Sequence, residues 1–577
     1  MSNATIAEIL QNIANLLELQ NADHFRIVSY QRAAQTIRGY GKELVEIYQT
    51  DPAQLLSIPG IGKSLAEKIT EIINTGTCQY YQELLGKTEP GLLEIMQLRD
   101  VGPKKTKLFY HELGIKNIDQ LKQAIQSGKL SELPRMGEKS ANKILTAIED
   151  RATFKERILL DEALTIAENL IDYLKQHKAC KQVSYAGSLR RRKETIGDID
   201  LLATSDTAKN KTALAEHFLN YPATQRVLAR GETKISVLLS NGRQVDLRIL
   251  QTKSFGAALH YFTGSKEHNI RIRERARKMG LKVNEYGVYQ GERWLAGRRE
   301  EEVFAKVGLP YIEPEMREDQ GEIELAEQQK LPKLIQLKDL KGDLQLHSNY
   351  TDGNATIADM ATAAKAYGLE YMALTDHTKS LYVAGGLMEK QLETQYKKID
   401  ALNKQLKGFR ILKSAEVDIK KDGSLDIADK TLAKMDSVLV SLHSSFTLDK
   451  DKQTKRVIKA LENPYTCIFA HPTGRIINQR RPVEFDLEEI IKAAVANHVA
   501  LEINGQPARL DLHDRHIRLA KSLGAKFVIS SDSHSPSSFG YLFFGVAMAR
   551  RGWLEKQDVL NTMSVDKLLA YFGRKTK

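Results

Sequence analysis

The sequence predicts a multidomain protein of mixed α+β and α/β class, helical at its N-terminus and built from strand-and-helix units at its C-terminus. Its 577 residues suffice for about four domains. Up to residue 180, apolar positions recur at helical spacing between Pro and Gly breaks. From residue 183, β-rich segments alternate with helical ones. Beyond residue 340, seven apolar strand segments recur between helical patterns, which predicts a parallel α/β barrel.

The composition is that of an ordinary globular protein, with 42% hydrophobic and 27% charged residues. Cys78, Cys180 and Cys467 are too few and too distant for a disulfide framework, and they fit a reducing compartment. No apolar run approaches the roughly 18 residues of a membrane span, and residues 1–10 lack the pattern of a secretory signal. We therefore expect a cytoplasmic protein with no membrane partner.

The net charge of +12 is unevenly distributed. Residues 101–300 have 37 basic and 23 acidic side chains, whereas residues 301–350 have 6 and 11. Such an excess favours a surface that neutralises phosphates, although solvated charges alone would give the same composition. The acidic segment 313–334, bounded by prolines, is interpreted as an interdomain linker.

Three segments, 57–69, 98–109 and 133–145, share an apolar residue, a Gly turn and a following helix. The glycine permits the tight turn, and the unpaired N–H groups at the helix start can hold a phosphate whatever the base sequence. The segments resemble helix-hairpin-helix elements, which implies binding to the DNA backbone; plain Gly-turned helix corners are the alternative. The DNA-binding residues expected are Gly60, Gly62, Gly102, Lys104, Lys105 and Gly137.

The stretch from residue 21 through the first of these segments resembles the N-terminal lyase domain of DNA polymerase beta. In that family a lysine on the helix after the Gly hairpin forms a Schiff base with the sugar of an abasic site, and Lys68 occupies the matching position. Such a lysine acts only when its amine is partly deprotonated. Arg26 and Tyr30 also match, but Ser64 replaces a lysine, so a solvent-facing role for Lys68 stays open.

Three aspartates of the central region are candidates for a metal site. Asp198 and Asp200 would lie on one face of a strand because strand side chains alternate, and Asp246 follows on another β-like segment. Three carboxylates from adjacent strands can hold two Mg²⁺ ions about 4 Å apart, one for the attacking hydroxyl and one for the leaving pyrophosphate. This predicts a phosphoryl-transfer site that uses Mg²⁺ or Mn²⁺.

With the Gly-Ser turn upstream and YFTGS downstream, this pattern is that of the nucleotidyltransferases, and residues 1 to about 320 resemble a family X DNA polymerase. The resemblance implies that Asp198 and Asp200 bind both metals and that Asp246 binds the catalytic one. It implies that Ser188 and Arg191 hold the triphosphate. The nucleotide-binding residues implied are Arg157, Gly187, Ser188, Arg191, Tyr261, Phe262, Gly264, Asn269 and Arg273.

Of the 14 histidines, eight follow residue 340, and five of these lie in motifs at the ends of strand-like segments. Imidazoles and carboxylates at one rim of a barrel can form a multinuclear site for Zn²⁺, Mn²⁺ or Fe²⁺. The motif order resembles the polymerase and histidinol phosphatase (PHP) domain, a trinuclear metal phosphoesterase fold. The ligands implied are His347, Asp352, His377, Glu416, His443, His471, Asp532 and His534.

One residue departs from the PHP pattern, since Gln345 occupies the first position of the usual His-x-His motif. An amide oxygen is a poorer ligand than imidazole for soft metals, which implies one weakly bound ion or a harder ion such as Mn²⁺. The resemblance implies 3′-5′ exonuclease, 3′-end phosphoesterase or abasic-site endonuclease chemistry. A vestigial structural domain is the alternative.

The full resemblance is to a bacterial family X polymerase with a C-terminal PHP domain. It implies a helical lyase-like domain (1–85), helix-hairpin-helix fingers (86–150), a nucleotidyltransferase palm with a mixed sheet (151–250), a small α+β thumb (251–318), a linker (319–336) and a PHP-type distorted (β/α)7 barrel (337–577). We expect a monomer that fills short gaps in gapped or primer-template DNA from deoxynucleoside triphosphates during repair. The alternatives are a PHP phosphoesterase with a non-polymerising DNA-binding front half, and a DNA-binding scaffold with both sites silent.

Overall fold

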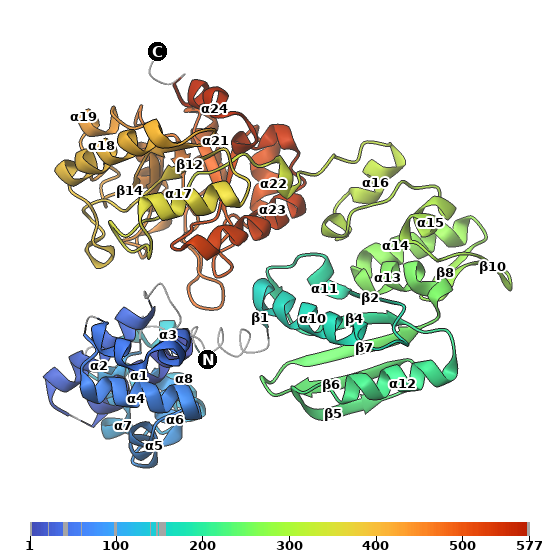
Figure 1. The fold of residues 1–577 in the computed structure, drawn as a ribbon, viewed down its shortest axis with the longest axis horizontal. Coiled ribbons are helices and arrows are strands. Elements are labelled where there is room, and N and C mark those ends of the chain that lie inside the picture. Colours follow the sequence, from blue (N-terminus) through green and yellow to red (C-terminus); the bar gives the residue numbers. More distant parts are fainter. Residues whose placement is uncertain are drawn as a thin grey trace. The chain divides into compact units, whose positions relative to one another are not determined.

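The structure is a computed structural model that describes residues 3–20, 22–38, 44–58, 60–96, 98, 101–134, 136–138, 140–145, 148 and 157–573. The chain divides into two compact units, one of residues 1–156 with the loop 352–355 and one of residues 157–351 with 356–577. Figure 1 draws the chain coloured along the sequence, with the helices of residues 3–132 in blue. Among the described residues, none of the helices has both the length and the apolar character needed to cross a membrane.

The described part of the first unit is helical. In α4, Leu65, Ile69 and Ile72 are buried at helical spacing, and Gly76 ends the helix with φ +82°. The helices in the described part of the first unit are α1 (Asn3–Leu19), α2 (His24–Arg38), α3 (Leu44–Thr50), η1 (Pro52–Ser57), α4 (Lys63–Thr75), α5 (Gln79–Gly86), α6 (Pro90–Met96), α7 (Pro103–Leu113), α8 (Ile118–Gln126) and η2 (Lys129–Glu132).

The three Gly segments all fall in this unit. Gly62 and Gly102 are the N-cap residues of α4 and α7, and Gly60 has φ +80°. At the third segment, the backbone N–H groups of Ser140 and Ala141 donate to the Gly137 carbonyl. Pro59, Arg99, Asp100, Arg135 and Lys139 of these segments lie outside the described residues.

The second unit begins with a mixed five-stranded sheet in the order β2-β4-β7-β6-β5. Strands β4 and β7 are parallel, and the other neighbours are antiparallel. One face packs on α10 and α12, and the other carries Leu202 and Leu250 against α13. The elements are β1 (Ile158–Leu159), α10 (Leu160–Lys175), β2 (Gln182–Tyr185), α11 (Gly187–Arg190), β3 (Thr195–Ile196), β4 (Ile199–Thr204), α12 (Ala208–Leu219), β5 (Thr224–Arg230), β6 (Lys234–Leu239) and β7 (Gln244–Leu250).

A small α+β region follows, with an antiparallel sheet in the order β10-β9-β8 beside three helices. Val288, Phe304 and Ile312 lie in its core. The elements are η3 (Thr252–Ser254), α13 (Phe255–Thr263), α14 (Lys266–Lys278), β8 (Lys282–Asn284), β9 (Gly287–Gln290), β10 (Arg293–Ala296) and α15 (Glu300–Lys306).

The acidic segment interpreted as a linker is folded. It forms η4 (Pro314–Met316) and α16 (Glu322–Glu327), and Met316, Ile323 and Leu334 join the core of the preceding region. Its buried acids are paired, since Glu322 accepts from the His268 ring nitrogen at 2.7 Å. The segment 313–334 is polar in composition, but its few apolar residues pack in a core and its buried acids are paired with cations.

The C-terminal region contains two parallel sheets, β11-β12-β13 and β14-β15-β16-β17-β18. Single parallel bridges join the two sheets: His377, after β12, pairs with Glu416 of β14, and Leu346, after β11, pairs with Ser533, after β18. The strands number eight among the described residues rather than the predicted seven, because the segment 410–418 breaks at Ser414 and Ala415 into β13 and β14.

The elements of this region follow a repeated strand-and-helix order. They are η5 (Leu337–Asp339), β11 (Gly342–Asp343), α17 (Ile357–Ala366), β12 (Tyr371–Leu374), η6 (Tyr382–Ala384), α18 (Glu389–Gln405), β13 (Arg410–Lys413), β14 (Glu416–Asp418), α19 (Asp429–Leu432), β15 (Leu439–Ser441), α20 (Lys450–Leu461), β16 (Ile468–Phe469), α21 (Leu487–Ala496), β17 (Ala500–Asn504), α22 (Asp514–Ser522), β18 (Phe527–Ser530), η7 (Pro536–Tyr541), α23 (Leu542–Arg551), η8 (Lys556–Asp558), η9 (Leu560–Thr562) and α24 (Val565–Phe572).

Candidate active sites

The strand register brings two of the central aspartates together. Asp200 in β4 is the direct partner of Asp246 in the parallel strand β7. Asp198 lies just before β4, in a bend rather than within the predicted strand. The Gly-Ser turn lies against the same carboxylate, because a Cβ on Gly187 would come within 2.7 Å of Asp200 Oδ2.

Each of these two carboxylates is paired with a cation. Asp200 Oδ1 accepts from Arg248 at 2.9 Å, and Asp246 Oδ2 lies 2.6 Å from Lys234 Nζ. The pKa of Asp200 is raised to about 6 by burial and by the negative charge of Asp198. Burial also acts on Asp246, but hydrogen bonds from Lys234, Ser236 and Gln244 outweigh it and lower its pKa.

The three aspartates do not appear among the groups of the described residues whose ligand atoms all lie within 4.8 Å of one another. Their acidic oxygens are nevertheless the donor type that Mg²⁺ and Mn²⁺ prefer. Arg248 was missed by the sequence argument, although its position two residues after Asp246 placed it on the same face of β7.

Several of the expected nucleotide-binding residues contact one another: Arg191 lies beside Gly264, and Tyr261 lies beside Asn269 and Arg273. Arg191 Nη1 donates to the Thr263 carbonyl, and a Cβ on Gly264 would lie 3.1 Å from that nitrogen. Asn269 Nδ2 donates to the Tyr261 carbonyl at 2.6 Å, and the guanidinium of Arg273 lies 5.8 Å from the centre of the Tyr261 ring.

Phe262 and Arg157, two further residues of this set, contact neighbours of the aspartates. The guanidinium of Arg248 lies 4.2 Å from the centre of the Phe262 ring, which brings Phe262 next to the cation that binds Asp200. Arg157 donates to Thr195 Oγ1 at 2.9 Å, and a Cβ on Gly197 would lie 3.1 Å from its Nη1. Ser188 is the second residue of α11.

An ionic network behind this site was not predicted. Glu300 binds Arg190 at 2.5 Å and Arg317 at 2.7 Å, and all three side chains are largely buried. Burial raises the pKa of Glu300, but Arg317 and Arg190 outweigh it and lower the pKa to about 2. The partners lie far apart in sequence, so no local pattern pointed to them.

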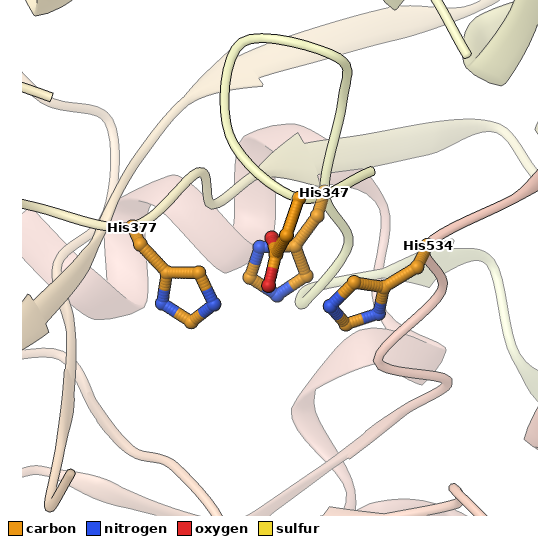
Figure 2. Close-up of side chains that lie close together, drawn as sticks. His347, His377 and His534 are labelled. Atoms are coloured by element: carbon orange, nitrogen blue, oxygen red, sulfur yellow. The ribbon is translucent and has the colours of Figure 1, made fainter. Parts of the chain in front are cut away.

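The C-terminal region contains two groups of ligating side chains that share His377. In one, the ligand atoms of His347, Asp352, His377 and His534 all lie within 4.8 Å of one another, and in the other His377 joins Glu416 and His443. Figure 2 shows the imidazoles of His347, His377 and His534 side by side. Their ring centroids lie 4.5 Å apart for His347 and His377 and 4.3 Å apart for His347 and His534.

Glu416 lies at the centre of these groups and is almost fully buried. Its oxygens lie 2.8 Å from His471 Nε2, 3.2 Å from His443 Nε2, 3.3 Å from His377 Nδ1 and 3.5 Å from His347 Nε2. Asp532 Oδ1 lies 3.3 Å from His347 Nε2. The strand ends therefore bring the sequence-predicted ligands other than Asp352 into one region, and Asp352 comes from the loop 352–355.

The electrostatics of this cluster favour the ionised form of Glu416. Burial raises the pKa of Glu416, but His377 and His443 outweigh it and hold the pKa well below its usual value. Burial has the opposite effect on a histidine and lowers the pKa of His443. The negative charges of Glu416 and Asp418 outweigh this effect and raise the pKa of His443 to about 10. Nitrogen and carboxylate donors held so close together fit a site for divalent transition metals.

Gln345 does not face this cluster as a free ligand. Its side-chain oxygen accepts from Asn504 Nδ2 at 3.2 Å, and the same nitrogen donates to Asp532 at 3.1 Å and lies 3.3 Å from Glu502 Oε2. The amide orientation is fixed because Asn504 Oδ1 accepts from the Gln506 N–H at 3.0 Å. A neutral N–H donor thus occupies the point where three side-chain oxygens converge.

In the first unit, Lys68 lies near Ser64 and Arg26, which were compared with the lyase family in the sequence analysis. Its Nζ donates to Ser64 Oγ at 3.0 Å and to the Ser64 carbonyl at 3.2 Å. The same amine lies 5.4 Å from the centre of the Tyr80 ring, and the guanidinium of Arg26 lies 4.9 Å from that ring. The aromatic ring stacks in turn on Tyr30, with centroids 6.1 Å apart.

Known families match four parts of the chain. They are the DNA polymerase beta thumb at residues 258–318, a helix-hairpin-helix domain at 1–78, a SAM-like helix-hairpin-helix tandem at 92–150 and the PHP domain at 343–506. The fold and these matches define a polymerase-beta-like protein that continues into a PHP domain.

Curated relatives narrow this class. The DNA polymerase/3′-5′ exonuclease PolX of Bacillus subtilis (strain 168) is 38% identical over 578 residues, which cover 100% of both chains. DNA polymerase lambda of Rattus norvegicus is 25% identical over 343 residues, 55% of this chain and 56% of its own length. A probable phosphatase of Thermoanaerobacter sp. (strain X514) is 28% identical over 233 residues, 39% of this chain and 90% of its own.

The chain belongs to the bacterial family X DNA polymerases that carry a C-terminal PHP domain, because the Bacillus relative matches it from end to end. Both the polymerase and the PHP families are metal-dependent, and the PHP domain of this chain contains candidate metal-binding groups.

Proposed function

We propose that the chain fills short gaps in DNA by template-directed transfer of deoxynucleotides. The observation that carries this proposal is the parallel register of Asp200 and Asp246, with the Gly187 turn against the Asp200 carboxylate. When bound, two Mg²⁺ or Mn²⁺ ions supply the Lewis acidity for nucleotidyl transfer. Asp198 and Asp200 would hold both ions, and Asp246 would hold the ion beside the primer 3′-hydroxyl.

The remaining residues would bind and select the nucleotide. Ser188 and Arg191 would hold the triphosphate, with Arg157 in support, since guanidinium groups match phosphate oxygens in geometry and charge. The turn of Tyr261, Phe262 and Gly264 would pack against the deoxyribose and exclude a 2′-hydroxyl. Asn269 and Arg273 would contact the minor-groove edge of the nucleotide and the template; their contacts with Tyr261 support a common site.

The test uses a labelled primer on a one-nucleotide gap, with each deoxynucleotide supplied separately against each template base. We expect incorporation of the complementary nucleotide only, and its loss in Asp198→Ala. Asp206→Ala is the matched control, because Asp206 follows the same strand but binds Thr252. Incorporation that persists in Asp198→Ala would refute the assignment of the site, and incorporation without a template would indicate a terminal transferase.

We further propose that the PHP domain removes nucleotides from DNA 3′ ends in the 3′-5′ direction. The observation that supports it is Glu416, a buried carboxylate whose oxygens lie within 3.5 Å of four imidazoles. Bound Mn²⁺, Zn²⁺ or Fe²⁺ would supply a hydroxide near neutral pH. The ligands would be His347, Asp352, His377, Glu416, His443, His471, Asp532 and His534. Because Asn504 donates to Gln345, we expect Mn²⁺ to support activity better than Zn²⁺.

The exonuclease is tested with His377→Ala, since His377 belongs to both ligand groups. His498→Asn is the control, because His498 is exposed and has φ +52°, a conformation that asparagine tolerates. Primer shortening should be lost in the first variant and kept in the second. Substrates with a 3′-phosphate and with an internal abasic site distinguish exonuclease from 3′-end phosphoesterase and abasic-site endonuclease. Unchanged shortening in His377→Ala would assign the activity elsewhere.

A third candidate activity is a 5′-deoxyribose phosphate lyase with Lys68 as its nucleophile. The position of the amine between Ser64 and the Tyr80 ring, beside Arg26, favours it. Borohydride reduction should trap the wild-type chain and Lys63→Ala on an incised abasic substrate, but not Lys68→Ala. Equal trapping of all three would leave Lys68 as an ordinary helix lysine.

We propose the domain limits 1–85, 86–150, 151–250, 251–318, 319–336 and 337–577, and the four family matches support this order. The chain would act as a cytoplasmic monomer on gapped or primer-template DNA. Light scattering of the purified chain tests the monomer, with a mass near 65.0 kDa expected and a doubled mass excluding it.

A further inference from the structure

A helix of the PHP domain takes part in the core of the palm. Phe543 and Phe544, at the start of α23, pack against the cluster that contains Leu201 and Leu247 of the palm sheet. The guanidinium of Arg192 lies 4.9 Å from the centre of the Phe543 ring. The two domains therefore share apolar contact as well as the covalent connection.

Arg551, the last residue of α23, reaches the proposed triphosphate turn. It is 4% exposed, and its Nη1 donates to the carbonyl oxygen of Arg191 at 2.7 Å. Arg191 is the C-cap residue of α11, the helix that contains Ser188. Asp514 of α22 binds the other end of the Arg551 guanidinium.

The Arg551 guanidinium also shares a carboxylate with the Arg191 side chain. Glu318 Oε1 lies 3.1 Å from Arg551 Nη1, 3.1 Å from Arg191 Nε and 3.2 Å from Lys193 Nζ. Burial raises the pKa of Glu318, but Arg191, Arg551 and Lys193 outweigh it and lower the pKa. Each cation that binds Glu318 weakens the hold of this carboxylate on Arg191.

A second PHP arginine binds the segment that follows this turn. Arg475 Nη2 lies 2.7 Å from Glu194 Oε2, and Arg475 is itself fixed by the carbonyls of Arg509 and Leu510. Arg475 follows the proposed metal ligand His471 by four residues. Residues 191–194 are therefore held by buried PHP cations at both ends.

We propose that the PHP domain completes the nucleotide site of the polymerase, with Arg551 as the positioning residue for Arg191 and Arg475 as a second support. The inference rests on the proposed role of Arg191 in triphosphate binding. Without Arg551, the Arg191 carbonyl loses its donor, and Glu318 is left to hold the Arg191 guanidinium more strongly. Both changes withdraw Arg191 from an incoming triphosphate.

The test compares Arg551→Met with Arg550→Met in the full chain. Arg550 is the adjacent residue of α23 and binds Glu313 and Glu315 instead of the turn, which makes it a matched control. With gapped DNA, we expect Arg551→Met to raise KM for the nucleotide about tenfold, equivalent to roughly 1.4 kcal/mol, with kcat within about twofold. Affinity for gapped DNA, shortening of the same primer and the KM of Arg550→Met should stay unchanged.

Two milder variants keep the test valid if Arg551→Met does not fold. Arg551→Lys retains the charge beside Glu318, so its KM should lie between the KM of the wild-type chain and that of Arg551→Met. Asp514→Asn leaves Arg551 in place but frees one end of it, and should raise KM by a smaller factor. An unchanged KM in these variants would overturn the proposal. So would a raised KM accompanied by an equal fall in kcat and in primer shortening, if Arg550→Met showed the same changes. Failure of the wild-type chain to copy a template would instead refute the proposed function.

Discussion

Glu300 provides a direct test of the buried ionic network behind the palm. Its carboxylate is 5% exposed and binds Arg190 and Arg317, and Arg317 is fully buried. Substitution Glu300→Gln keeps the shape of the side chain and removes its charge. Two buried guanidinium groups then lose their common counter-charge. Removing one partner of a buried ion pair strongly lowers folding stability, because an uncompensated charge stays buried.

The magnitude follows from the pKa of Glu300, which falls from 4.5 to about 2 on folding. At roughly 1.4 kcal/mol for each tenfold change in proton affinity, the ionised carboxylate stabilises the fold by about 3 kcal/mol at pH 7. Because the pKa of the folded state is the lower one, this stability is present above pH 4.5. It is lost as the pH falls through 4.5 toward 2.

Urea unfolding followed by tryptophan fluorescence measures this effect. Trp294 lies in β10 and Trp553 packs against the thumb core, so both report on the region that contains Glu300. Glu300→Gln should lose about 3 kcal/mol at pH 7, and the difference from wild type should shrink steadily below pH 4.5. Glu324→Gln, in an exposed pair with Arg271, should cost less than about 1 kcal/mol. A loss for Glu300→Gln that does not change between pH 7 and pH 3 would refute the electrostatic explanation.

Three further predictions concern the two sites. Gly187→Ala should abolish incorporation and spare primer shortening, because Gly187 has φ +59° and its new Cβ would come within 2.7 Å of Asp200; a fully active variant would contradict the close approach. Mn²⁺ should raise the unfolding temperature of the metal-stripped wild-type chain, and the increase should be smaller in His377→Ala; equal increases would exclude His377 as a shared ligand. Gln345→His should retain more Mn²⁺ per chain after dialysis, as measured by atomic emission, because imidazole is a better ligand than an amide paired with Asn504; an unchanged content would show that Asn504 keeps ions out by itself.

The fold class and the family were predictable from the sequence, because the histidines and aspartates of the two sites lie at or near the ends of apolar strand segments. His377, His443 and His471 each follow a short buried strand, and parallel strands end at one rim. The same logic applies to Asp200 and Asp246, whose strands are adjacent and parallel. The structure brings these side chains together, and their individual roles stay predictions.

Long-range polar contacts were not predictable. Arg551 and Glu318, or Gln345 and Asn504, are separated by more than 150 residues, and neither periodicity nor composition records such pairings. Asp198 was expected inside a strand but precedes it, because strand limits vary by a residue or two at their ends. The segment 313–334 was interpreted as a linker from its acidic composition, which did not show that its acids are bound by arginines and a histidine.

The folded segment 313–334 affects how the enzyme can be divided. A fragment that ends at residue 318 would lose Ile323 and Leu334 from its own core, and one that ends at residue 336 would still expose the patch that Phe543 and Phe544 cover. Newly bared apolar surface promotes aggregation. Truncated forms made to isolate either activity should therefore be judged first by their solubility, and inactivating point substitutions are the safer means of separating synthesis from degradation.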